Sequence, residues 1–203
     1  MGDFPMKFAL TAISAAALAT VAAPSAQAAT VVNLDGVTNA SLNGSNGVTL
    51  NLAAGTYSLS FIQDAYTAFT RFSSTSGCDG AGMNCALGWE NSARYIIGNT
   101  AYLFGDGAAS GGIGPLGVGD GYYNTAALSF AKSSIYNGSF TLNSASAVTF
   151  FIYDDNLGDN SGGVSLSVGA VPEPATWMMM MIGIGAIGGL MRRRRISTTV
   201  RYA

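Results

Sequence analysis

The chain has 203 residues and no histidine, the side chain that most often moves protons near neutral pH. This absence excludes Ser-His-Asp and Cys-His hydrolysis, histidine-ligated zinc and any mechanism with a histidine general base. Charged side chains are also scarce, since Lys, Arg, Asp and Glu together make up 10% of the residues. Acid–base chemistry in this protein would therefore depend on a small number of carboxylates.

Cysteine is nearly absent as well, because Cys78 and Cys85 are the whole supply. Two cysteines without a C-x-x-C pattern and without histidine cannot complete the four ligands of a zinc site. In an exported protein, a single close pair of cysteines is typical of a disulfide. We therefore predict a disulfide between Cys78 and Cys85 that closes a small glycine-rich loop.

The C-terminal region combines prolines, an uncharged run and a basic cluster. As a helix rising ~1.5 Å per residue, the uncharged run at 175–191 would span roughly 25 Å, so we predict a transmembrane helix there. Trp177 stands at one edge of the run, where an amphipathic ring favours a membrane interface. Pro172 and Pro174 hold the preceding segment extended and accessible to a protease. The basic cluster follows the other edge, on the expected cytoplasmic side: Arg192, Arg193, Arg194 and Arg195.

This order of features resembles the PEP-CTERM sorting domain over residues 171–195, and within it the PEPxxWA-CTERM subtype. The resemblance implies recognition near Pro172-Glu173-Pro174 by exosortase, an integral-membrane protease of the transpeptidase type. One position departs from the subtype, because Met178 stands where the subtype has alanine. The same type of tail is also known as an ice-binding-protein C-terminal domain, a name that implies no ice binding here.

The N-terminal region has the features of a secretory signal peptide over residues 1–28. Lys7 precedes an apolar run at 8–23, and the small residues Ala26 and Ala28 favour cleavage by signal peptidase after Ala28. We expect a precursor held transiently in the inner membrane, with residues 196–203 as a short cytoplasmic tail. The expected destination is the surface or surroundings of a Gram-negative bacterium.

The body between these two ends is acidic. Residues 29–171 contain nine acidic and three basic side chains, a net charge of −6 that the whole-chain value of −2 conceals. Such a body is expected to avoid nucleic acid and anionic lipid head groups. Its length favours a single secreted domain, which we place at 29–170.

Short runs of β-favouring residues recur along the body and predict an all-β, jelly-roll-like sandwich. No part of the body shows sustained helical periodicity. The glycine-rich region at 105–121 is expected to form a long surface loop. The predicted strands are 56–61, 94–97, 139–142, 148–153 and 164–168, and the predicted turns are Asp35-Gly36, Asn43-Gly44, Asn137-Gly138 and Ser161-Gly162.

The loop at 154–162 concentrates oxygen-bearing side chains between the predicted strands 148–153 and 164–168. Hard oxygen ligands gathered on a loop are typical of calcium sites, although the spacing does not match an EF-hand. Together with the strand at 164–168, the loop is similar to that of calcium-dependent galactose-binding bacterial lectins, which implies carbohydrate binding. The alternative is a solvated turn whose side chains cap the backbone. The candidate calcium ligands are Asp154, Asp155, Asp159 and Asn160.

Other chemistry has weaker support. Glu90 is the only glutamate of the body and could act with an aspartate in a glycosidase, but a surface acid beside a partly buried Trp89 is the alternative. A G-x-G-x-x-G pattern at 112–117 lacks the strand and helix that a nucleotide site requires. Trp89, Tyr122 and Tyr123 could stack on sugar rings or pack in the protein. 

We therefore expect an exported protein without enzymatic activity, sorted through its tail and structural or adhesive in a biofilm or exopolysaccharide. A carbohydrate-binding module, with calcium as the one candidate cofactor, is the alternative, and a carboxylate-based glycoside hydrolase is a weaker one. The expected partners are signal peptidase, exosortase and extracellular polysaccharide, with no nucleic acid.

Overall fold

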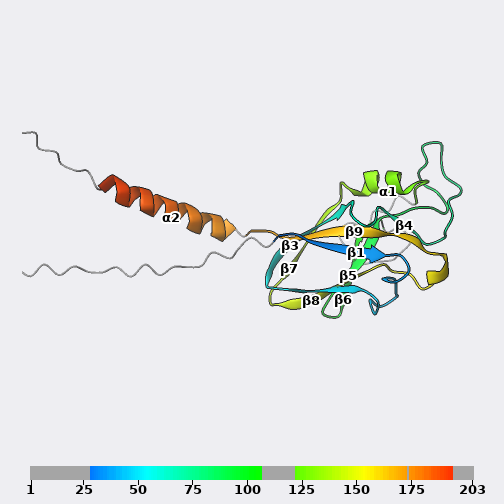
Figure 1. The fold of residues 1–203 in the computed structure, drawn as a ribbon, viewed down its shortest axis with the longest axis horizontal. Helices are drawn as coiled ribbons and strands as arrows, with labels where there is room; N and C mark the ends of the chain where they lie inside the picture. Colours follow the sequence, from blue (N-terminus) through cyan, green and yellow to red (C-terminus); the bar gives the residue numbers. More distant parts are fainter. Residues whose placement is uncertain (1–27, 107–121, 173, 194–203) are drawn as a thin grey trace, which may run out of the picture.

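The computed structural model describes residues 28–106, 122–172 and 174–193 (Figure 1). Several predictions concern residues outside these ranges. They are the signal peptide with Ala26, residues 107–121 of the glycine-rich loop, Glu173 of the sorting motif, Arg194, Arg195 and the tail at 196–203.

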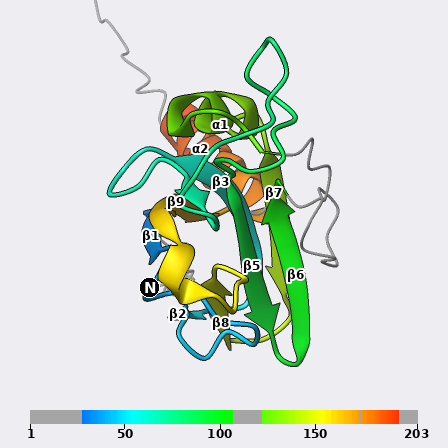
Figure 2. The ribbon, with the colours of Figure 1, turned by 90° about the vertical axis from the view of Figure 1, so that its right-hand side faces the viewer.

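The body is a sandwich of two antiparallel sheets, which confirms the mainly β prediction. The first sheet has the order β1-β9-β3-β7, and a two-residue strand, β4, also pairs with β9. The second sheet has the order β2-β8-β5-β6. Figure 2 shows β5 and β6 side by side in this second sheet. The strands of the first sheet are β1 (Thr30–Asp35), β3 (Gly55–Ile62), β4 (Phe69–Thr70), β7 (Asn137–Leu142) and β9 (Ser161–Ala170). Those of the second are β2 (Val48–Leu52), β5 (Ser92–Ile97), β6 (Thr100–Gly105) and β8 (Ser146–Phe151).

The core lies between the two sheets and is built from alternate residues of their strands. On β3, for example, Tyr57, Leu59 and Phe61 are buried, because successive side chains of a strand point to opposite faces. Aromatic contacts join the sheets: the ring centroids of Phe61 and Phe104 lie 4.7 Å apart, and those of Tyr95 and Phe140 lie 5.3 Å apart. Burial of these large rings supplies much of the hydrophobic stabilisation.

Four of the five predicted strands lie within observed ones, and the fifth, at 148–153, overlaps β8. The turns were predicted less well. Asn137-Gly138 and Ser161-Gly162 do not form turns but begin β7 and β9. Gly105 is not in the expected surface loop either, because it ends β6, and the next residue, Asp106, is buried. In each case a strand extends into residue types that usually favour turns.

A helix, α1 (Ala126–Ser133), was not predicted. It has only eight residues, and its buried positions are Ser129 and Ser133, so its inner face carries no apolar stripe that periodicity could reveal. Thr125 caps its start, because the Oγ1 atom accepts a hydrogen bond from the Leu128 N–H at 3.2 Å. A short 3₁₀ helix, η1 (Leu157–Asp159), lies before β9.

The second α-helix, α2 (Pro174–Arg193), forms where an apolar helix was predicted. It stands away from the sandwich in Figure 1, and its side chains from Trp177 to Arg192 are exposed. Within the described residues, no helix has both the length and the apolar character that crossing a membrane requires. The structure thus supports a helix over the predicted segment 175–191 and does not support its assignment as a membrane span.

Candidate functional site

The candidate site lies at the end of the sandwich where β9 begins. There the first residues of β9 pair with β4, through Phe69 with Gly162 and Thr70 with Ser161. Phe69 also forms a bridge with Glu90, and the neighbouring Trp89 forms one with Tyr123. Segments from four parts of the chain are thus joined into a small ladder. Because side chains alternate across such a ladder, it has an inner and an outer face.

The inner face carries a buried ion pair between Arg71 and Glu90. The Glu90 Oε1 atom accepts hydrogen bonds from the Arg71 guanidinium, with Nε at 2.8 Å and Nη2 at 2.7 Å. Ser92 donates its hydroxyl to the other carboxylate oxygen, Oε2, at 3.0 Å. Asp154 contributes a second carboxylate, whose Oδ2 lies 4.0 Å from the Arg71 Nε. The alternative of a surface acid is therefore wrong for Glu90, which is only 3% exposed.

Burial dominates the electrostatics of this cluster. It raises the pKa of Glu90 above its ordinary value, although the positive charge of Arg71 and the Ser92 hydroxyl act in the opposite direction. Burial acts to lower the pKa of Arg71, but the charge of Glu90, its hydrogen bond and the nearby Tyr122 and Asp154 together raise this pKa above its ordinary value. Burial, with the nearby charge of Glu90, also raises the pKa of Tyr122 to about 12. The charged groups of the cluster thus contact one another and are largely buried.

The candidate calcium ligands Asp154, Asp159 and Asn160 each make hydrogen bonds in or beside the loop, and each leaves one buried oxygen atom without a hydrogen-bond partner. The Asp154 Oδ1 atom accepts backbone N–H bonds from Asp155 at 2.7 Å and Asn156 at 3.1 Å, so Asp154 caps the turn. The Asp159 Oδ2 atom accepts a bond from the Asn156 amide at 2.8 Å. Asn160 donates to the carbonyl oxygen of Gly36 at 2.6 Å, while Asp155 is exposed.

Calcium binding at this loop stays a prediction. In the part of the chain that the structure describes, no three His, Cys, Asp or Glu side chains are grouped so as to hold a metal ion. Asp154 caps the backbone of the turn, as the alternative interpretation of this loop predicts.

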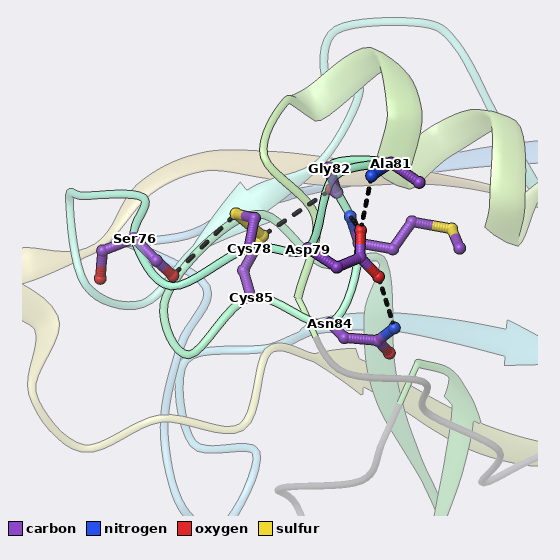
Figure 3. The surroundings of a disulfide bond; sticks show 8 residues. Ser76, Cys78, Asp79, Ala81, Gly82, Asn84 and Cys85 are labelled. Carbon is purple, nitrogen blue, oxygen red and sulfur yellow. Dashed lines mark hydrogen bonds between the residues drawn. A yellow bond between two sulfur atoms is a disulfide. The ribbon is translucent and has the colours of Figure 1, made fainter.

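The disulfide between Cys78 and Cys85 is confirmed. Figure 3 shows Asp79 inside the loop that the disulfide closes: its Oδ1 accepts the Ala81 and Met83 N–H groups at 2.9 Å each, and its Oδ2 accepts the Asn84 amide at 2.8 Å. These hydrogen bonds lower the pKa of Asp79, and the bond from the Met83 N–H has the largest effect. 

The disulfide loop is tied to the ladder on both sides. The Cys85 N–H donates to the carbonyl of Tyr122 at 2.9 Å, and Ser76 bridges Leu87. The disulfide thus fixes the start of the segment that carries Trp89.

The outer face of the ladder contains a cavity of about 140 Å³. Trp89, which is half-buried, supplies its aromatic wall. The other walls carry hydroxyl groups, from residues of β4, of the loop after it and of the start of β9: Thr70, Ser73, Ser74, Thr75 and Ser161. Trp89 is a sugar-stacking candidate from the sequence alone, whereas these hydroxyl residues are not. A run of serine and threonine at 73–76 shortly before a tryptophan is the signal that could have indicated them.

The tail follows β9 without interruption. The Val171 N–H donates to the carbonyl of Thr56 at 2.8 Å, which ends the pairing with the sandwich. Pro172 is exposed, and α2 begins at Pro174, a residue well suited to the first helical position. Trp177 is 55% exposed. The exposure of Pro172 agrees with the accessibility expected of a processing site.

Residues 170–195 match the PEP-CTERM protein-sorting motif. The resemblance of the tail is thereby confirmed. A PEP-CTERM motif implies an exported protein of the cell surface or its surroundings that exosortase sorts and processes. No curated protein and no solved structure matches the chain. The PEP-CTERM match thus concerns the tail, and the role of the body has to be argued from its own residues.

Proposed function

We propose that the chain is a surface protein of a Gram-negative bacterium whose body acts by binding, as a structural or adhesive component of an extracellular polysaccharide matrix. The observation that carries the proposal is the PEP-CTERM motif at 170–195, attached to a body whose strongest charged cluster faces inward. Such a body offers a surface for contact and a rigid sandwich to hold it, and the tail supplies delivery to the cell surface.

The order of the strands supports a jelly roll as the finer class of this sandwich. Without β4, eight strands form two four-stranded sheets, and the chain crosses from one sheet to the other between β1 and β2, β2 and β3, and β3 and β5. It returns through β6, β7, β8 and β9, which pair with the strands of the first half. Two interleaved Greek keys of this kind define the jelly roll, which is common in capsid and lectin domains.

The state of Glu90 supports a body without catalytic activity. A glycosidase needs two accessible carboxyl groups on opposite sides of a sugar, one of them free to give up a proton. Glu90 is buried, and both of its oxygens are hydrogen-bonded, to Arg71 and to Ser92. A second carboxylate, that of Asp154, is also buried, and it lies 4.0 Å from the Nε atom of the same arginine. The glycoside hydrolase alternative is therefore not favoured.

The proposal can be tested in a Gram-negative host that contains an exosortase. Cells would export either the natural chain or a variant in which Pro172, Glu173 and Pro174 are replaced by alanine. We expect mass spectrometry of the natural protein at the surface to find no peptide from residues 196–203, and cells that export it to retain more matrix polysaccharide. The variant should keep these peptides and lose the gain in polysaccharide.

A Ser144→Ala variant serves as the matched control, because Ser144 is exposed in the turn between β7 and β8, at the opposite end of the sandwich from the cavity. It should behave as the natural chain. Intact C-terminal peptides on mature surface protein would contradict processing. Unchanged matrix polysaccharide in cells that do process the chain would contradict the adhesive role.

A further inference from the structure

We propose that the cavity beside Trp89 is a binding site for a neutral polysaccharide, with room for one hexose ring at a time. This inference rests on the proposed binding function and assigns it to a place and to a chemical class of ligand. The site comprises the cavity residues already named: Thr70, Ser73, Ser74, Thr75, Trp89 and Ser161.

The position of Trp89 is set by a glycine. Gly162 has φ +79°, and a Cβ atom on it would lie 3.0 Å from the Cζ3 atom of Trp89 and 2.4 Å from the carbonyl oxygen of Ala68. The indole therefore lies against the backbone of β9, where only glycine leaves room for it. Trp89 also lines the cavity. An aromatic ring held in this way presents a flat apolar face at little entropic cost, which suits the C–H face of a sugar ring.

Hydroxyl groups complete the site on the other walls. Serine and threonine hydroxyls both donate and accept hydrogen bonds, so they can pair with sugar hydroxyls in either sense. Ser74 and Thr75 are exposed, and Ser73 is held by a hydrogen bond from its hydroxyl to the backbone carbonyl of Asp159. An apolar platform with a few polar groups that fix orientation is the usual composition of a small-molecule site. Its volume of about 140 Å³ suits a single ring rather than a larger ligand.

Charge selects a neutral ligand over an anionic one. No residue that lines the cavity is ionisable. The body has three basic residues, and two of them are occupied: Arg71 pairs with Glu90, and the Arg94 guanidinium lies 3.5 Å from the ring centroid of Tyr153. The third, Lys132, belongs to α1. Uronate or sulfate groups would thus find no cation in the cavity and would meet a body of net charge −6.

The test measures binding of the processed, exported protein to soluble polysaccharides by affinity electrophoresis and titration calorimetry. Neutral probes would be a mixed-linkage β-glucan and a galactomannan, and the anionic probe would be a polyuronate, each at low and at high salt. We expect binding to at least one neutral probe that salt does not weaken, since no ion pair is made. The polyuronate should not bind.

Two variants of the indole locate the site. Trp89→Ala should weaken binding roughly tenfold, and Trp89→Phe, which keeps a flat ring, should remain within about threefold of the natural protein. Ser74→Ala should also weaken binding, whereas Ser144→Ala, the same change at the far end of the sandwich, should not. Because Ser74 is exposed, its variant folds normally even if Trp89→Ala does not.

The outcomes separate this inference from the proposed function. Salt-sensitive binding of the polyuronate, in place of the neutral probes, would overturn the inference and leave an adhesive function standing. Binding of a neutral probe that is unchanged in Trp89→Phe, Trp89→Ala and Ser74→Ala would place the site elsewhere and overturn the inference. Absence of binding to every probe would also overturn the inference. The proposed function would be contradicted only if cells that process the chain also retained no additional matrix polysaccharide.

Discussion

Glu90 carries its carboxylate in a part of the protein that water does not reach, and the fold tolerates it because Arg71 lies against it. Removing one partner of a buried ion pair is costly, since the other charge is left without compensation. The pair also has a structural consequence: Arg71 follows β4 directly, and Glu90 bridges Phe69 of the same strand. Two residues thus hold β4 to the segment that contains Trp89.

The raised pKa of Glu90 leads to a prediction about pH. Burial raises it from an ordinary value of 4.5, so between pH 4.5 and the folded-state pKa the folded protein holds a proton that the unfolded chain has lost. Glu90 therefore contributes stability that is complete below pH 4.5 and is lost as the pH rises through the folded-state pKa. We expect Glu90→Gln to remove this contribution, so that the difference in unfolding free energy between natural protein and variant changes with pH.

Urea denaturation between pH 4.5 and 7 would measure this difference. Asp79→Asn is a suitable control, because the pKa of Asp79 is lowered from 3.8 by backbone hydrogen bonds. The stability that the Asp79 carboxylate contributes is lost only as the pH falls through its folded-state pKa, which lies below 3.8. Asp79→Asn should therefore not alter the slope of unfolding free energy against pH above pH 4.5. If the unfolding free energy of Glu90→Gln changed with pH as steeply as that of the natural protein, this result would contradict the buried, proton-binding state of Glu90.

At the scale of elements, the disulfide loop has the clearest consequence for the site. Replacing Cys78 and Cys85 together by serine should lower the unfolding free energy by about 2–3 kcal/mol, because the unfolded chain regains the freedom of a short loop. It should also weaken binding at Trp89, since Cys85 pairs with Tyr122 in the ladder that holds this tryptophan.

Thermal melting with and without a reducing agent would test this prediction. The reducing agent should lower the melting temperature of the natural protein to that of the double variant and leave the variant unchanged. A natural protein that melts at the same temperature in both conditions would show that the disulfide does not stabilise the body.

The elements also show where sequence reasoning succeeded. Alternating or continuous β-favouring runs identified parts of β3, β5, β7, β8 and β9, because each of these strands buries one face or both. Strand β2 was missed although its residues Val48–Leu52 alternate between apolar and polar, whereas the serine-faced helix α1 gave no comparable signal. The cavity could not be predicted, because its hydroxyl groups come from segments as distant as Thr70 and Ser161, which only strand pairing brings together.

At the scale of the whole molecule, the body and the tail are independent in their packing. The buried residues of the core all lie between Val32 and Val168, whereas the side chains of α2 from Trp177 to Arg192 are exposed. A PEP-CTERM tail that is removed during sorting should leave the rest intact, and this arrangement meets that requirement. Among the described residues, the backbone hydrogen bond from Val171 to Thr56 is the last that joins the end of β9 to the sandwich.

Removal of residues 174–203 should therefore leave the melting temperature of the body within about 2 °C of that of the longer chain, since no core contact is lost. Leu166→Ala provides the contrast, because Leu166 is fully buried on β9 and its truncation should cost about 2–5 kcal/mol. Differential scanning calorimetry of the three proteins would compare the two effects. A marked loss of stability on removal of the tail alone would mean that α2 packs on the sandwich in solution and stabilises the body.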